Sequence, residues 1–79
     1  MAASRILVVD DNAMNLEMAT FLLSSDGWVV AQATNAAQAL ACLDSFIPDA
    51  VLMDIQLPDV DGLTASLPAR LFHFRVLLD

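Results

Sequence analysis

The sequence predicts an α/β domain in which a parallel β-sheet carries helices on both faces. Short apolar runs alternate with segments of helical spacing, in the order strand, helix, strand, helix, strand. The apolar runs show no polar–apolar alternation, which is typical of strands buried on both faces. The connections are short, so each helix must cross over between two parallel strands. Such crossovers place helices on the two sides of one sheet.

The first strand is predicted at Arg5–Val9, where a β-branched apolar run stops at a polar cluster. The residues from Ala13 to Ser25 favour helix, and Gly27 supplies a left-handed stop just after them. Two stripes follow the helical period. The first stripe is Asn15, Ala19, Leu22 and Leu23, and the second is Met14, Met18 and Phe21. The second stripe fits either a broad core face or a docking patch for a partner.

The second strand is predicted at Trp28–Ala33 and the third at Ala50–Met53. Between them, Asn35 followed three residues later by Gln38 is typical of a helix-capping pair. The residues with helical spacing behind this pair are Ala36, Ala39, Leu40 and Leu43. Up to Gly62 the pattern is that of one small domain, without repeats or a linker.

Composition excludes several classes of function. Of the 79 residues, 58% are hydrophobic and 16% charged, which excludes a solvated disordered tail. The net charge of −7, with three arginines and no lysine, argues against binding to nucleic acid or to an anionic membrane surface. Neither a signal peptide nor a membrane span is expected, so we expect a cytoplasmic protein. The single Cys42 is expected to be a buried bystander.

Three acidic residues lie where the predicted strands end. Asp10 and Asp11 follow the first strand, and Asp54 follows the third. In an open parallel sheet, ligands gather beyond the carboxyl ends of the strands, where the strand order reverses. If the two strands are neighbours, three carboxylates meet there, and a hard cation such as Mg²⁺ relieves their repulsion. One carboxylate can then act as a nucleophile toward phosphorus.

These residues carry a family resemblance. Its segments are Ile6-Leu-Val-Val-Asp-Asp-Asn12 with Asn15, and Asp54-Ile-Gln-Leu-Pro-Asp-Val-Asp-Gly62. Together, over residues 5–63, they resemble the N-terminal part of bacterial two-component response-regulator receiver (CheY-like) domains. The Asp-Asp-Asn sequence followed by Asn15 is most similar to the receivers of hybrid histidine kinases.

The resemblance implies a truncated flavodoxin-like fold with strand order 2-1-3. It implies that Asp54 accepts a phosphoryl group, and that the donor is a histidine kinase or a histidine phosphotransfer protein. In such domains Asp11 would ligate Mg²⁺ directly, Asp10 would act mainly through water, and the carbonyl of Gln56 would supply a further ligand. Gln56 also occupies a position that modulates hydrolysis of the phosphoaspartate. The protein would be a phosphorelay component and not an enzyme.

The sequence departs from the family after residues 1–64. The family's phosphate-contacting Ser or Thr and its pairing Lys cannot be assigned, and the chain has no lysine at all. Two further hypotheses therefore stand beside a working phosphoacceptor. One is a truncated, switch-deficient receiver that binds Mg²⁺ weakly and serves as a dimerisation or docking module. The other is an aberrant tail on a protein without independent function.

The segment 65–79 is a tail unlike the family. Pro68 should end the third helix after barely one turn. Leu71–Leu78 fits an edge strand, with a short amphipathic helix as the alternative. His73 is expected to be a half-exposed strand residue, and only the charge of Arg75 favours it as a stand-in for the missing lysine.

With the order 2-1-3, the third strand would be an uncovered apolar edge. The tail could fold back as a fourth strand of its own chain, or pair with a second copy. We therefore expect a homodimer, built largely on residues 65–79.

Overall fold

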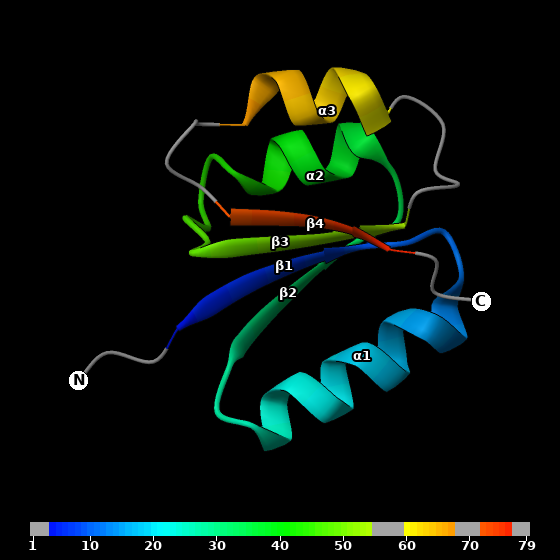
Figure 1. The fold of residues 1–79 in the computed structure, drawn as a ribbon, viewed down its shortest axis with the longest axis vertical. Coiled ribbons are helices and arrows are strands. Elements are labelled where there is room, and N and C mark those ends of the chain that lie inside the picture. Colours follow the sequence, from blue (N-terminus) through cyan, green and yellow to red (C-terminus); the bar gives the residue numbers. More distant parts are fainter. Residues whose placement is uncertain (1–3, 55–59, 68–71, 77–79) are drawn as a thin grey trace.

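The computed structural model describes residues 4–54, 60–67 and 72–76. Within them the chain forms a sheet of four strands and three helices (Figure 1). In chain order the elements are β1 (Arg5–Val9), α1 (Ala13–Ser25), β2 (Val29–Ala33), α2 (Ala36–Cys42), β3 (Ala50–Asp54), α3 (Val60–Ser66) and β4 (Phe72–Val76). The predicted α/β class is confirmed, and the second strand begins one residue later than predicted.

The sheet has the strand order β2-β1-β3-β4, and every pairing in it is parallel. This contains the predicted order 2-1-3. The strand β1 lies in the interior of the sheet, and its residues from Ile6 to Val9 are at most 5% exposed. Burial on both faces explains why this segment is continuously apolar in the sequence.

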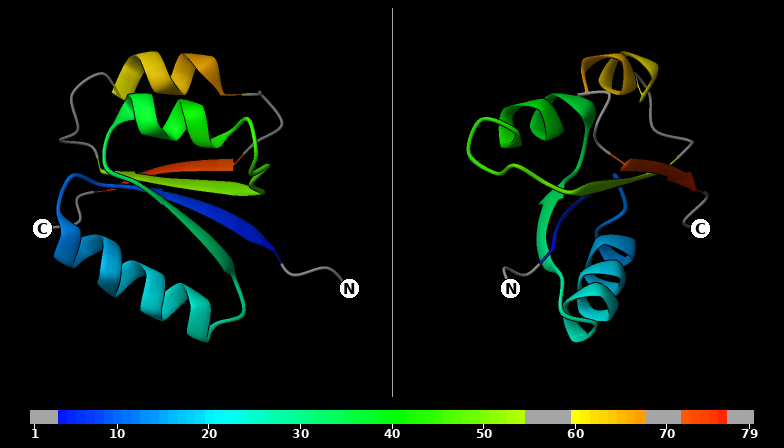
Figure 2. Two further views of the ribbon diagram at one scale, coloured as in Figure 1. Left: turned by 180° about the vertical axis from the view of Figure 1, so that it is seen from behind. Right: turned by 60° about the vertical axis from the view of Figure 1, so that its left-hand side comes forward.

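The helices form two layers, with α1 on one face of the sheet and α2 and α3 on the other (Figures 1 and 2). The main core lies between the sheet and the α2–α3 layer. Its buried members are Leu7, Val9, Ala33, Ala39, Val51, Met53, Leu63 and Leu67. On the α1 face fewer side chains are buried: Ile6, Val8, Leu16 and Ala50. None of the described helices is long and apolar enough to cross a bilayer.

Helix α1 has the predicted bounds because both of its ends are capped. The side chain of Asn12 accepts hydrogen bonds from the backbone N–H groups of Met14 (2.9 Å) and Asn15 (3.1 Å). These groups have no partner within the helix itself. After the last turn, Gly27 adopts a φ of 95°, a conformation that glycine reaches without the strain of a Cβ atom.

We expect Asn12→Ala to lower the free energy of unfolding by about 1 kcal/mol, because two N–H groups of α1 lose their acceptor. Urea denaturation followed by circular dichroism measures this loss. Ser45→Ala is the control, since Ser45 is an exposed residue outside any cap. An equal loss in both variants would contradict a capping role.

Helix α2 begins at the predicted pair, although the two side chains bond differently than in the simple capping motif. Asn35 accepts from the N–H of Gln38 at 2.8 Å. The Oε1 atom of Gln38 accepts from the N–H of Thr34 (2.8 Å) and from its hydroxyl (2.7 Å). In the capping motif, the Gln38 side chain would accept from the N–H of the N-cap residue Asn35. Here it accepts from Thr34, one residue earlier in the chain.

The amphipathic interpretation of α1 was partly wrong. Leu16 is the buried residue of this helix, while Leu22, assigned to the inner stripe, is exposed. The second stripe is exposed as well, so the core alternative for Met14, Met18 and Phe21 is excluded. Gln32 on β2 holds the helix to the sheet, donating to the carbonyl of Leu16 (3.4 Å) and the hydroxyl of Thr20 (2.6 Å). This tether aligns α1 over β1 and β2.

The C-terminal segment resolves the alternatives that the sequence left open. Residues Phe72–Val76 form a strand and not a helix, and this strand pairs with β3 of the same chain from Ala50↔Phe72 to Asp54↔Val76. Of the two predicted alternatives, the one in which the tail folds back as a fourth strand of its own chain is confirmed, and β4 covers the edge that β3 would otherwise present. Helix α3 ends before Pro68, as expected, but its seven residues exceed the single turn that was predicted.

Candidate functional site

Strand register brings two of the acidic residues together. Strands β1 and β3 are parallel neighbours, with Val8 opposite Leu52 and Val9 opposite Met53. The next residue of each strand is an aspartate, so Asp10 and Asp54 end adjacent strands at the same edge of the sheet. A shift of this register by one residue would separate the two carboxylates.

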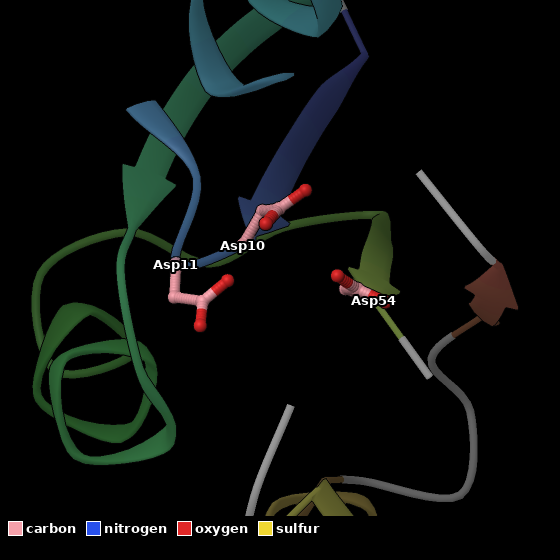
Figure 3. Close-up of side chains that lie close together, drawn as sticks. All are labelled: Asp10, Asp11 and Asp54. Carbon is pink, nitrogen blue, oxygen red and sulfur yellow. The ribbon is translucent and has the colours of Figure 1, made fainter. Parts of the chain in front are cut away.

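Asp11 completes a cluster of three carboxylates. One carboxylate oxygen from each of Asp10, Asp11 and Asp54 lies within 4.8 Å of the other two. Figure 3 shows Asp10 and Asp54 at the ends of their strands and Asp11 in the turn that follows β1. Asp10 is fully buried and Asp54 is 3% exposed, whereas Asp11 faces solvent. The cluster therefore reaches solvent at Asp11.

The local backbone holds Asp10 in place. Its N–H donates to the carbonyl of Ala33 at the end of β2 (3.0 Å). Its Oδ1 atom accepts from the N–H of Asn12 at 2.9 Å. Its Oδ2 atom is buried and has no hydrogen-bond partner among the residues that the structure describes. A buried carboxylate oxygen without a partner is costly, so this atom is available to a ligand that supplies positive charge or a proton.

The donor set fits a hard divalent cation. Three carboxylates offer the oxygen ligands that Mg²⁺ prefers, and the open side leaves room for the waters that Mg²⁺ retains. Among the side chains that the structure describes, Arg5 is the one Lys or Arg. It lies at the far end of β1, 4.4 Å from the ring of Phe46. The charge of the cluster is therefore not offset by a described basic side chain.

The structure brings together three of the predicted site residues, Asp10, Asp11 and Asp54. Other predicted site residues lie outside the part of the chain that the structure describes. Gln56 lies outside it, and so do the side chains of His73 and Arg75. Asn15, which the motif contained without an assigned role, lies in a groove beside α1 and not in the carboxylate cluster. Leu22 also lines this groove and is exposed, whereas the helical period predicted it on the inner face of the helix.

Comparison with known proteins gives a family match over most of the chain. Residues 6–68 match the family described as response regulator receiver domain. The chemotaxis protein CheY of Bacillus subtilis is 47% identical over 64 residues, which are 80% of this chain and 53% of that protein. Hybrid signal transduction histidine kinase B of Dictyostelium discoideum is 35% identical over 66 residues, which are 84% of this chain and 3% of that protein. The chain thus spans about half the length of the CheY relative.

Solved structures of receiver domains are similar to this chain as well. A CheY-like receiver domain from Methylobacillus flagellatus has a TM-score of 0.73 at 27% identity, over 85% of this chain and 61% of that one. CheY6 of R. sphaeroides, in a crystal structure with the P1 domain of CheA3, has a TM-score of 0.71 at 31% identity, over 92% of this chain and 62% of that one. In both comparisons the similarity extends over most of this chain.

Proposed function

This chain belongs to the response regulator receiver domain family, and on that premise we propose that it accepts a phosphoryl group from a phosphohistidine onto Asp54. The position of Asp54 supports the proposal most directly. The residue is 3% exposed at the end of β3, and its carboxylate lies within 4.8 Å of the carboxylates of Asp10 and Asp11. A nucleophile needs this combination of a fixed position and an adjacent charge-balancing site.

In the proposed transfer, a carboxylate oxygen of Asp54 attacks the phosphorus atom. The bond between phosphorus and the imidazole nitrogen breaks, and the released histidine nitrogen takes up a proton from solvent. The product is an acyl phosphate on Asp54, so the protein modifies itself and does not turn over a substrate. The N–H of Asn12 keeps Asp10 oriented by donating to its Oδ1 atom, and the buried Oδ2 atom has no hydrogen-bond partner among the described residues.

We propose that Asp10, Asp11, Asp54 and the carbonyl of Gln56 hold Mg²⁺. The orphaned Oδ2 atom of Asp10 and the three converging carboxylates support this assignment. When bound, Mg²⁺ supplies charge compensation for the carboxylates and for the phosphoryl oxygens. Asp11, being exposed, would hold the metal from the solvent side of the cluster.

The proposed phosphodonor is a histidine kinase or a histidine phosphotransfer protein. Two similarities support it: a relative is a hybrid histidine kinase, and a structural neighbour was crystallised with the P1 domain of CheA3. The absence of nucleic-acid and membrane partners, and a cytoplasmic location, stay predictions from the acidic composition.

The alternative is a switch-deficient receiver that acts as a docking or dimerisation module. The observation in its favour is that the chain contains no lysine. Losing one preorganised charge contact typically raises the barrier to such a transfer by on the order of 3–4 kcal/mol. The alternative therefore predicts Mg²⁺ binding without a productive acyl phosphate.

Phosphoramidate is the test, because its P–N bond resembles that of phosphohistidine. With Mg²⁺ present, intact-mass spectrometry should show one phosphoryl group per chain, gained slowly, and Asp54→Asn should gain none. Asp44→Asn is the matched control, since Asp44 is an exposed acid outside the cluster. Labelling that survives Asp54→Asn would place the acceptor elsewhere. Binding of Mg²⁺ with no label at any time would favour the switch-deficient module.

We also propose that the chain is a homodimer. The first reason for placing its contact in residues 65–79 was the uncovered edge of β3, and β4 of the same chain now occupies that edge. The division into a receiver part (1–64) and a tail (65–79) with its own role in association stays a proposal.

A further inference from the structure

Asn12 connects the carboxylate cluster to helix α1. Its N–H donates to the Oδ1 atom of Asp10 at 2.9 Å, and its carbonyl accepts from the N–H of Leu16 at 3.1 Å, as in a helix. Its side-chain oxygen caps the helix by accepting from the N–H groups of Met14 and Asn15. One exposed residue is therefore bonded to the cluster through its backbone and to the helix through its backbone and its side chain.

The orientation of the Asp10 carboxylate depends on this one N–H group. Asp10 is fully buried, and its Oδ2 atom has no hydrogen-bond partner among the described residues. If the N–H of Asn12 turned away, Oδ1 would lose its described partner as well. The carboxylate could then rotate, and a buried oxygen without a partner is costly.

The backbone conformation of Asn12 sets the direction of its N–H. The residue is extended, with φ −96° and ψ 114°, directly before the helix begins at Ala13. An N-cap residue takes this conformation so that its side chain can reach the free N–H groups of the first turn. Alanine has no such acceptor and is the strongest helix former, so it would favour extending the helix by one residue. The accompanying change of φ rotates the peptide plane between Asp11 and Asn12 relative to the helix, and the N–H rotates with it.

We propose, on the basis of the Mg²⁺ site proposed above, that the side chain of Asn12 is a positioning residue for this site. By capping α1 it directs the backbone N–H toward Asp10, and it thereby preorganises Asp10 and Asp11 for the metal. Asp11 lies between two hydrogen-bonded turns, one from Asp10 to Asn12 and one from Asn12 to Met14, so the cap restrains both ligands. Figure 3 shows the two carboxylates on this short segment. Asn12 acts on the metal through these ligands and is not a ligand itself.

Two substitutions separate positioning from helix stability. Glycine is a moderately good N-cap, far better than alanine, but it has no side-chain acceptor and leaves the backbone unrestrained. A role in helix stability alone therefore predicts wild-type Mg²⁺ affinity for Asn12→Gly, whereas positioning predicts a loss. Serine keeps an oxygen that can accept from the same N–H groups, so Asn12→Ser should preserve the affinity.

Titration of the full chain with MgCl₂, followed by nuclear magnetic resonance, measures the Kd on the folded molecules alone. Loss of a group that orients a metal ligand typically weakens metal binding about 10- to 100-fold. Because the N–H of residue 12 itself remains, we expect the low end, a Kd about tenfold higher in Asn12→Ala and Asn12→Gly. The matched control is Asn35→Ala. Asn35 is also an exposed N-cap, accepting from the N–H of Gln38 at 2.8 Å, but it caps α2, and its loss should leave the Kd unchanged.

Urea denaturation gives a second readout through thermodynamic linkage. An ion that binds only the folded state stabilises it according to its Kd, so a variant with a weaker site gains less from Mg²⁺. The loss of unfolding free energy in Asn12→Ala should therefore be larger in saturating Mg²⁺ than in EDTA. The expected difference is about 1.4 kcal/mol, the equivalent of a tenfold change in Kd. In Asn35→Ala the loss should be the same in both conditions, because a lost helix cap costs the same with and without the metal.

The outcomes distinguish failure of the positioning role from failure of the metal site. A wild-type Kd in both Asn12→Ala and Asn12→Gly would overturn the positioning role and leave the metal site standing. So would a Kd raised equally by Asn35→Ala, because any lost cap would then weaken the site, or a Kd raised as much by Asn12→Ser as by Asn12→Ala. A wild-type chain that binds no Mg²⁺ would overturn the positioning role together with the metal site on which it rests.

Discussion

Asp10→Asn is expected to stabilise the metal-free protein and, in the same molecule, to abolish its stabilisation by Mg²⁺. Asp10 is fully buried, and its carboxylate lies within 4.8 Å of two others. Two unit charges about 5 Å apart repel one another by roughly 3 kcal/mol at an effective dielectric constant of 20. Solvent at the exposed Asp11 screens part of this repulsion, so we expect a gain of on the order of 1–2 kcal/mol.

The asparagine also preserves the local structure. Its Oδ1 atom can still accept from the N–H of Asn12, and its new N–H₂ group can donate to the carboxylate of Asp54 or Asp11. In the wild-type protein, Mg²⁺ at 100 times its dissociation constant should add about 2.7 kcal/mol to the free energy of unfolding. The variant should lose this increment because one of the three charged ligands is gone.

Thermal and urea denaturation with EDTA and with millimolar Mg²⁺ measure both effects. Asp11→Ala and Asp54→Asn should lose the Mg²⁺ response too, and Asp44→Asn, with an exposed acid outside the cluster, should keep it. A wild-type midpoint that does not move with Mg²⁺ would refute the metal site. A metal-free Asp10→Asn protein that is less stable than wild type would show that repulsion between the carboxylates is weaker than the interactions Asp10 makes as an anion.

Leu7→Ala is expected to cost about 3–5 kcal/mol of unfolding free energy, a large share of the stability of a chain of this size. Leu7 is fully buried in the interior strand β1 and belongs to the main core cluster. Removing a buried leucine side chain loses its transfer energy and leaves a cavity, because the surrounding packing relaxes only partly. A chain of 79 residues has a total stability of about 4–12 kcal/mol. The variant should therefore unfold at a much lower urea concentration than the wild-type chain.

Urea denaturation monitored by circular dichroism measures the loss. Leu40→Ala is the control: it makes the same chemical change in α2 at a side chain that is 40% exposed, and it should cost less than about 1–2 kcal/mol. Similar losses in the two variants would mean that β1 does not organise the core. Added Mg²⁺ should raise the unfolding free energy of Leu7→Ala, because an ion that binds only the folded state stabilises it.

The sequence predicted the local elements well because their signals are local. The apolar run from Arg5 to Val9 has to be buried on both faces, and it forms the interior strand β1. Gly27 was predicted to end α1 and does so through its backbone conformation. The Asn12 cap at the start of the helix was not predicted, although it too acts within a few residues along the chain. The convergence of Asp10 and Asp54 also followed from sequence, since it requires only that two parallel strands be neighbours in register.

The sequence did not predict which face of α1 would be covered. Helical period assigned Leu22 to an inner stripe, yet it is 60% exposed, because α1 packs against β1 and β2. For β4, too, the sequence did not predict which neighbour the element would pack against. Its apolar alternation indicated a strand, but whether that strand would pair within its own chain could not be read from the pattern.

By itself, then, the sequence determined the strand–helix order, the helix ends and the edge of the sheet at which the carboxylates meet, since each depends on interactions between near neighbours or on the rule for parallel crossovers. Only the tertiary structure decided that β4 covers β3, that Asp10 Oδ2 and Asn15 Nδ2 are buried without partners among the described residues, and that α1 keeps an apolar groove. These features depend on contacts between residues that are distant in the chain. Whether a side chain is buried there is decided by the other elements that pack against it.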